Sequence, residues 1–165
     1  MIYNWWYYNK RRRIFVYYLS VKYHLICNTF DIQTIMEKQG EILDLDDIKL
    51  LVDTFYERIR QNELLGPIFN ERIQERWPIH LEKMYKFWQT VLLQEHTYFG
   101  SPFPPHAQLP IDHQHFAAWL ALFNKTVDEL FTGEKATEAK WRAVKMAELF
   151  EAKMAYAKNN PYNIQ

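Results

Sequence analysis

The positions of apolar residues along the chain predict four long helices and no strand. In the run that follows Asp44, apolar side chains recur at intervals of three and four residues, which places them on one face of a helix. Three later segments repeat this spacing: roughly Pro78 to Glu95, a segment after Asp112, and a segment after Gly133. The chain is therefore predicted to be all-α, with one long irregular connection. The expected inward-facing residues are Ile48, Leu51, Val52, Phe55, Tyr56 and Ile59; His80, Met84, Phe87, Trp88 and Val91; Phe116, Trp119, Leu120, Phe123, Val127 and Leu130; and Ala139, Ala143, Met146, Ala147, Phe150, Met154 and Ala157.

The ends of these helices carry local signals. Asp44 and Asp112 each stand just before an apolar stripe, where a carboxylate can accept hydrogen bonds from the first free backbone N–H groups. Gly66-Pro67 is interpreted as the end of the first helical region. Gly133 separates the third helix from the fourth, which is expected to stop at the Asn159-Asn160-Pro161 sequence.

A proline-rich connection precedes the third of these helices. Four prolines and Gly100 fall between residues 98 and 110, and prolines both remove backbone donors and disfavour helix in the residue before them. His106 lies in the middle of this stiff segment, flanked by apolar residues. Two interpretations remain open at this point: a solvated loop histidine, or a ligand for a buried metal or haem iron. Two interpretations are likewise open for His80: a partly exposed residue at a helix start, or a ligand.

The composition of the chain excludes several kinds of binding site. The 165 residues are 48% hydrophobic and 17% aromatic, with a formal net charge of zero that gives no support for binding nucleic acid. Cys27 is the one cysteine, which excludes an intrachain disulfide framework, a zinc-thiolate site and covalent haem attachment through paired cysteines. A cytoplasmic protein is the expectation. No Glu-x-x-His pair, His-Glu-x-x-His motif or glycine-rich phosphate loop occurs. His113 and His115, two apart at a helix start, are expected to be surface residues rather than ligands.

Residues 1–35 differ from the rest of the chain. The first 30 residues hold ten of the 28 aromatic residues of the chain. Residues 1–35 show no sustained helical or strand periodicity, and their five basic residues and one acidic residue give a charge of +4. The basic cluster and the apolar run after it imitate a signal peptide, but Lys22 and His24 interrupt the run and no small-residue cleavage site follows. The run is also far shorter than the ~20 residues of a membrane span. We therefore expect translation to start at Met36, with 1–35 a spurious or unstructured leader and a domain at 41–160.

From about Leu45 to Lys158, a series of linked motifs resembles the truncated haemoglobins, and specifically their third group. The motifs are FYERIR followed by GPIFN, then ERWPIH, KFW with LL, YFGSPFPPH with LP, and HFAAWLALF. Their order and spacing together are specific, and the absence of a Gly-Gly pair favours the third group over the first two. The resemblance implies a shortened globin, a two-on-two α-helical sandwich around haem.

The resemblance also implies roles for individual residues, position by position. His106 is similar to the proximal ligand of the haem iron, and Tyr56 and Trp119 are similar to the distal tyrosine and tryptophan that donate hydrogen bonds to a bound gas. Met84 departs in size and softness from the branched aliphatic residue of the family. Helix spacing alone makes Arg72, Arg76 and Lys83 candidates for the haem propionates. The residues expected to contact the cofactor are Phe55, Trp77, His80, Met84, Phe87 and Trp88.

The function implied by the resemblance is gas binding at a five-coordinate haem b iron that is held without a covalent link. Donors aimed at a partly negative O₂ ligand slow its release more than that of CO, which favours redox chemistry over O₂ delivery. NO dioxygenase and peroxidase-like activities both fit, with O₂, NO and CO as ligands and an unidentified reductase as partner. Two alternatives stay open: haem-based gas sensing, which needs a further domain to receive the signal, and a cofactor-free helical interaction module.

Overall fold

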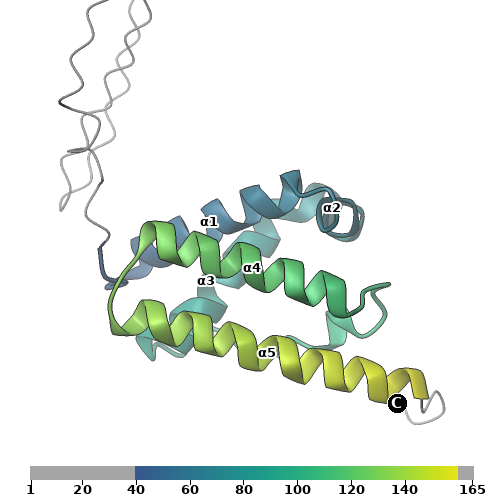
Figure 1. Cartoon of the computed structure of the whole chain (residues 1–165). Coiled ribbons are helices and arrows are strands. Elements are labelled where there is room, and N and C mark those ends of the chain that lie inside the picture. The colour runs from purple at the N-terminus through teal and green to yellow at the C-terminus, as the bar shows by residue number, and fades with distance from the viewer. Residues whose placement is uncertain (1–39, 160–165) are drawn as a thin grey trace, which may run out of the picture. The chain divides into compact units, whose positions relative to one another are not determined.

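The computed structural model describes residues 40–159, and these residues form helices and connections (Figure 1). The long helices are α1 (Leu45–Gln61), α3 (Trp77–Leu93), α4 (His113–Leu130) and α5 (Glu134–Asn159). A short helix, α2 (Gly66–Ile73), and two 3-10 turns, η1 (Gln74–Arg76) and η2 (Pro104–His106), complete the set. Among the described residues the only β-type pairing is a single bridge between Gly40 and Phe131. The all-α prediction is confirmed.

The long helices form two pairs. α4 and α5 run antiparallel and pack side by side, α1 packs on α3, and contacts between α1 and α4 join the two pairs (Figure 1). This is the two-on-two arrangement that the sequence resemblance implied. None of the helices within residues 40–159 is both long and apolar enough to cross a membrane.

The core lies where α1, α3 and α4 meet, and aromatic rings fill it. Trp88 from α3 and Trp119 from α4 both stack on Phe123, at ring-centroid distances of 4.9 and 5.4 Å. Phe55 from α1 meets the same ring edge-on at 5.2 Å. All six predicted inward-facing residues of α1 are buried, so the helical spacing in the sequence correctly identified this face.

Both predicted N-caps are present. The Asp44 carboxylate accepts hydrogen bonds from the backbone N–H groups of residues 46 and 47, at 3.0 and 3.3 Å. Asp112 caps α4 in the same manner, and the Nδ1 atom of His115 completes a capping box with the backbone of Asp112. Gly133, expected to separate the last two helices, has a φ of +88°, a conformation that favours glycine.

The structure corrects the sequence interpretation at three helix boundaries. Gly66-Pro67 does not end the helical region but starts α2, because proline is tolerated in the first turn and Gly66 allows the chain to approach α1 closely. A Cβ atom at Gly66 would lie 2.7 Å from the carbonyl oxygen of Arg60. α3 begins one residue before Pro78 and ends at Leu93 rather than Glu95, because Gln94 adopts a left-handed conformation.

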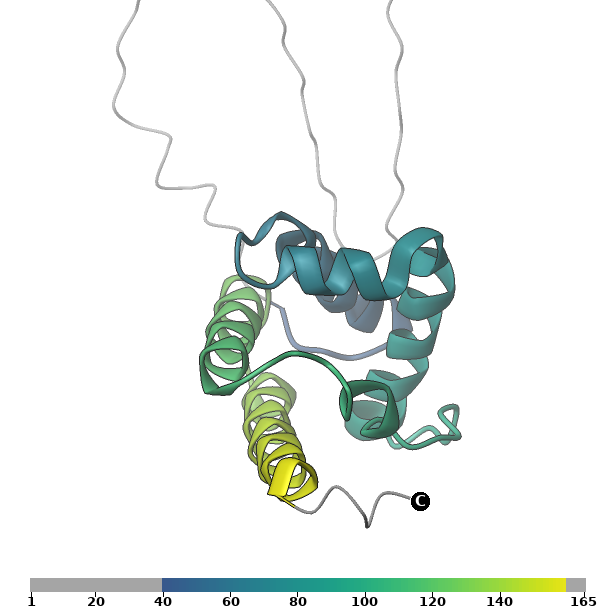
Figure 2. The ribbon, with the colours of Figure 1, turned by 90° about the vertical axis from the view of Figure 1, so that its right-hand side faces the viewer.

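Residues 94–112 connect α3 to α4 with only the three-residue η2 as regular structure, as the proline content predicted. Figure 2 looks along α4 and α5 and shows this connection crossing between them and the α2–α3 side. His106 is the last residue of η2. Three predictions concern residues outside the described range: the leader at 1–35, the translation start at Met36, and the end of the domain at residue 160.

Candidate functional site

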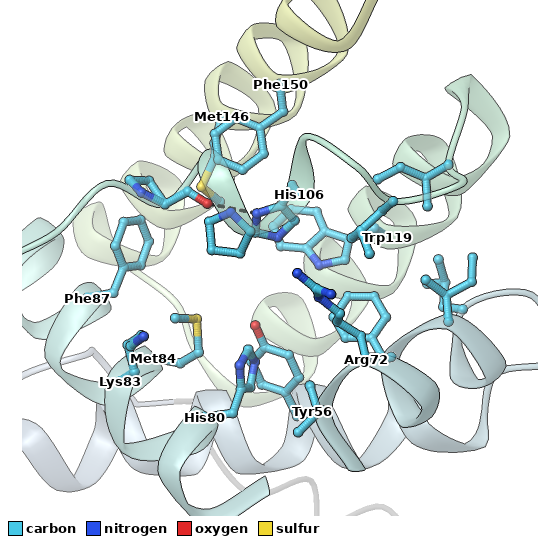
Figure 3. Close-up of a pocket in the computed structure, with 18 of the residues that line it drawn as sticks. Tyr56, Arg72, His80, Lys83, Met84, Phe87, His106, Trp119, Met146 and Phe150 are labelled. Carbon is cyan, nitrogen blue, oxygen red and sulfur yellow. Dashed lines mark hydrogen bonds between the residues drawn. The ribbon is translucent and has the colours of Figure 1, made fainter. Parts of the chain in front are cut away.

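A cavity of about 480 Å³ lies between α3, α2, the 94–112 connection and the α4–α5 pair. Most of its wall is apolar or aromatic. Seven of the nine predicted site residues line it, although they come from α1, α3, α4 and the connection: Tyr56, His80, Met84, Phe87, Trp88, His106 and Trp119. Helices that are far apart in sequence thus bring these side chains together around one space (Figure 3).

His106 is held in one orientation by its own loop. Its Nδ1 atom lies 2.7 Å from the carbonyl oxygen of Pro102. Because a carbonyl can only accept, Nδ1 carries the hydrogen and donates it, and the lone pair of the neutral ring is then on Nε2. A histidine oriented through one nitrogen in this way has the other nitrogen ready for a metal. The ring also packs on Phe150 of α5, at a centroid distance of 5.0 Å.

The surroundings of His106 favour its neutral form. Burial is the largest effect and lowers the pKa of His106, the hydrogen bond to Pro102 partly opposes it, and the charge of Arg72 lowers the pKa further. Only the neutral imidazole can coordinate a metal, so burial and the nearby guanidinium both favour a ligand role.

Tyr56 and Trp119 reach the cavity from α1 and α4. In Figure 3 the Tyr56 hydroxyl points into the space below His106, and Trp119 lies beside that space. Tyr56 is only 6% exposed, and burial raises its pKa, so the hydroxyl keeps its hydrogen throughout the physiological pH range. A protonated phenol and an indole can each donate one hydrogen bond.

His80, in the first turns of α3, lies against Tyr56 with ring centroids 4.9 Å apart and planes at 85°. Its Nε2 atom is buried and, in the part of the chain that the structure describes, has no hydrogen-bond partner. Burial lowers the pKa of His80 to about 4, with smaller contributions from His106 and Lys83. A buried polar atom without a partner is costly and uncommon, and it indicates that this wall is built to face a further group.

Phe55 and Trp77, two of the predicted cofactor contacts, lie outside the cavity lining. Phe55 meets the rings of Tyr56 and Trp119 edge-on, at 5.1 and 5.4 Å. Trp77 lies edge-on to Tyr56 and His80, at 6.2 and 5.9 Å. Both therefore stand behind residues that line the cavity and fix the positions of those residues. Their role as direct cofactor contacts stays a prediction.

The charged side chains of the lining, among the described residues, are all basic: Arg72, Arg76 and Lys83. These are the three candidates for the haem propionates. Each also belongs to the exposed surface, so the cations lie where the cavity opens. An apolar interior with basic residues at its opening suits a flat apolar group that carries carboxylates at one edge.

Many further lining residues were not predicted as part of the site, among them Tyr98, His115, Met146 and Phe150. The side chain of His115, expected to be a surface residue rather than a ligand, is 16% exposed and borders the cavity. The signal that could have identified it is its place three residues after Asp112, which turns its ring back toward the helix start. Met146 and Phe150 were predicted as inward-facing, but helical spacing alone does not tell which inward residues border a cavity.

Comparisons with known proteins agree with this architecture. Residues 41–154 match the family model for bacterial-like globins. A curated relative, the group 3 truncated hemoglobin ctb of Campylobacter jejuni, is 34% identical over 115 residues, which cover 67% of this chain and 91% of the relative. The crystal structure of group III truncated hemoglobin from Campylobacter jejuni superimposes with a TM-score of 0.65 at 33% identity, covering 71% of this chain and 95% of that one. The chain belongs to the bacterial-like globin family, and its fold is that of a truncated haemoglobin.

Proposed function

We propose that the cavity binds haem b without a covalent link and that Nε2 of His106 ligates the iron. Membership of the globin family implies a haem cofactor. The observation that carries the assignment is the 2.7 Å hydrogen bond from Nδ1 of His106 to Pro102, which leaves Nε2 as the free ligand atom in a lining of mostly apolar residues. The only cysteine of the chain is Cys27, so paired cysteines cannot attach the haem.

The remaining residues of the cavity fit this cofactor. Phe87, Trp88 and Met84 supply apolar surface for a planar ring, and the three cations at the opening suit its two carboxylates. His80, whose buried Nε2 atom has no partner among the described residues, also lines the cavity. No Asp or Glu lines the described cavity, so carboxylates entering it meet no like charge there.

Haem would supply reversible binding of O₂, NO and CO, and redox chemistry of O₂ and NO. The contribution of this chain is to orient and stabilise the gas ligand. Tyr56 and Trp119 would donate hydrogen bonds toward it, and burial keeps the phenol of Tyr56 protonated. Hydrogen bonds to a partly charged acceptor are worth about 1.5–3 kcal/mol each. They slow the release of O₂, so the site suits oxidation of NO or peroxide chemistry better than delivery of O₂.

Haem uptake tests this proposal directly. The protein prepared with haem should show a Soret band, and His106→Ala should lose it or bind haem weakly. His80→Ala should keep the band, because His80 begins a regular helix while His106 is fixed by its loop. His113→Ala is the matched control, since the side chain of His113 is 81% exposed. Equal haem loss in the His106 and His80 variants would show that the iron is wrongly placed. A wild-type protein without a Soret band would leave the cofactor-free helical module as the better hypothesis.

A further inference from the structure

The opening of the cavity has an unusual composition. Six residues both line the cavity and are exposed, and we call this set the mouth: Arg72, Arg76, Ile79, Lys83, Ser101 and Pro105. Three of the six are cations, and none is acidic. Ile79 stands between the cations in sequence, on the same stretch of α2, η1 and α3, and is 67% exposed, a high value for a large apolar side chain.

The mouth cations differ from most other surface cations of the described chain. Lys86 pairs with Glu82 at 2.8 Å, and Lys145 pairs with Glu148 at 2.8 Å. No such ion pair forms at Arg72, Arg76 or Lys83 within residues 40–159. The side chain of Arg76 instead donates to backbone carbonyl oxygens of residues 72 and 73.

The positive field of the mouth also reaches into the cavity. The charge of Arg72 lowers the pKa of His106, and the charge of Lys83 lowers the pKa of His80. The formal net charge of the whole chain is zero, whereas the charged residues of the cavity lining are all basic. The two carboxylates of a bound haem offset two of the three cationic charges, and a surplus of positive charge remains beside the exposed Ile79.

We propose that the mouth is the docking surface for a small acidic electron-transfer protein. Ile79 is the apolar centre of the contact, and the positive charge that the haem carboxylates leave uncompensated at Arg76 and Lys83 attracts a carboxylate of the partner. Exposed apolar centres with a charged rim are typical of such interfaces, and complementary charge raises the rate of encounter by about 10- to 1000-fold. The inference rests on the proposed function, because oxidation of NO to nitrate leaves ferric haem, which must be reduced to ferrous haem before O₂ can bind again.

The position of the mouth explains why an electron donor would dock there. The other lining residues are buried or only partly exposed, whereas the mouth residues are exposed, so a partner bound at the mouth lies next to the cavity. In the reaction, one electron leaves the reduced donor and converts ferric haem to ferrous haem. No bond is made or broken and no proton is required. The partner chemistry that fits is therefore a one-electron carrier with an acidic face.

The test uses the full-length haem-loaded protein and, as the probe, a plant-type ferredoxin with an acidic surface. Two quantities are measured between about 0.01 and 0.3 M salt, a range over which the screening length falls severalfold. One is the Kd for oxidised ferredoxin, and the other is the rate at which reduced ferredoxin reduces the ferric protein. We expect Lys83→Glu and Arg76→Glu to weaken binding by about ten-fold at low salt, and Ile79→Ser by about five-fold. The reduction rate should fall in parallel.

Lys125→Glu is the matched control, because Lys125 is 68% exposed on α4 and does not line the cavity. It should change the Kd by less than about two-fold, since a charge beyond the screening length has little effect. Equal effects of Lys83→Glu and Lys125→Glu, or a salt-independent rate, would overturn the docking surface. So would a wild-type dimer that Ile79→Ser dissociates, because a second copy would then occupy this face. The Soret band is recorded for every variant: its loss in the wild type refutes the proposed function, whereas an intact band with no response at the mouth refutes the docking alone.

Discussion

Replacing Tyr56 by phenylalanine removes a single hydroxyl from the wall opposite His106. The aromatic ring and its edge-on contacts with Phe55 and His80, at 5.1 and 4.9 Å, are preserved. None of the described residues forms a hydrogen bond with this hydroxyl, so its removal leaves no partner unsatisfied. The free energy of unfolding of the haem-free protein should therefore change by less than about 0.5 kcal/mol. Any large change in gas binding then reports the hydrogen bond to the ligand and not a damaged core.

The size of the expected effect follows from the environment of the hydroxyl. Tyr56 is 6% exposed, and a hydrogen bond that is shielded from water keeps most of its strength. A bond to a partly charged acceptor contributes about 1.5–3 kcal/mol. Since about 1.4 kcal/mol corresponds to a factor of ten, Tyr56→Phe should speed O₂ dissociation by about ten-fold or more. CO carries little charge on its terminal atom, so its dissociation should change much less.

Stopped-flow displacement measures both rates: O₂ replaced by CO, and CO replaced by NO. Trp119→Phe should act in the same direction as Tyr56→Phe. The double variant should fall short of the product of the two effects if both donors share one acceptor. Tyr98→Phe is a matched control, because Tyr98 also lines the cavity but comes from the 94–112 connection and packs edge-on against Phe87 at 5.4 Å.

Unchanged O₂ dissociation in both Tyr56→Phe and Trp119→Phe would refute the distal assignment. The two residues would then be core aromatics that happen to border the cavity. His106 would remain the proposed iron ligand, because its assignment depends on the hydrogen bond to Pro102 and not on the opposite wall. The preference for redox chemistry over O₂ delivery would be lost.

Three further predictions follow from the same geometry. His106→Gly should lose the Soret band and regain it when imidazole is added in solution, and a failure of imidazole to restore the band would argue against a ligand role. The pKa of His80 falls from 6.5 to about 4 on folding, so between these values the unfolded chain binds a proton that the folded chain does not. The free energy of unfolding of the haem-free protein should thus decrease by up to about 3 kcal/mol as pH falls through this window, and chemical denaturation of His80→Leu should show a flatter pH dependence. Gly66→Ala should lower the free energy of unfolding by about 2–3 kcal/mol, because its Cβ would lie 2.7 Å from a backbone oxygen of Arg60. Gly100→Ala should cost less, since the nearest atoms belong to a side chain at 3.2 Å that can move, and equal costs would contradict this explanation.

The long helices were predictable because their causes are local. The stripe of α1 and the caps Asp44 and Asp112 depend on residues within a turn or two of each other, and the structure contains them as expected. α2 was missed for the opposite reason. Gly66 and Pro67 favour a break when read locally, and the need for glycine arises only from the close approach to Arg60 on α1.

The candidate site came from the family resemblance, which assigned a role to individual residues. Residue spacing alone left open whether His106 or His80 is a ligand. Neither the residue spacing nor the resemblance showed which residues reach the cavity and which lie behind its wall. Phe55 and Tyr56 are neighbours on one apolar face, yet only Tyr56 reaches the lining. His115 was expected at the surface, yet its side chain is only 16% exposed and borders the cavity. These distinctions depend on how α4, α5 and the 94–112 connection pack in three dimensions, which no periodicity encodes.

A single physical cause, the removal of water from the cavity wall, sets the protonation states of the proposed site. Burial lowers the pKa of His106 and His80 and raises that of Tyr56. The same effect thus favours a neutral imidazole that can bind iron and a phenol that can donate a hydrogen bond. The haem-free protein bears a cost for this arrangement, because the buried Nε2 of His80 has no partner within residues 40–159. A cofactor that fills the cavity stabilises the folded state by mass action and by covering these apolar walls, so haem binding and folding stability must be coupled in this chain.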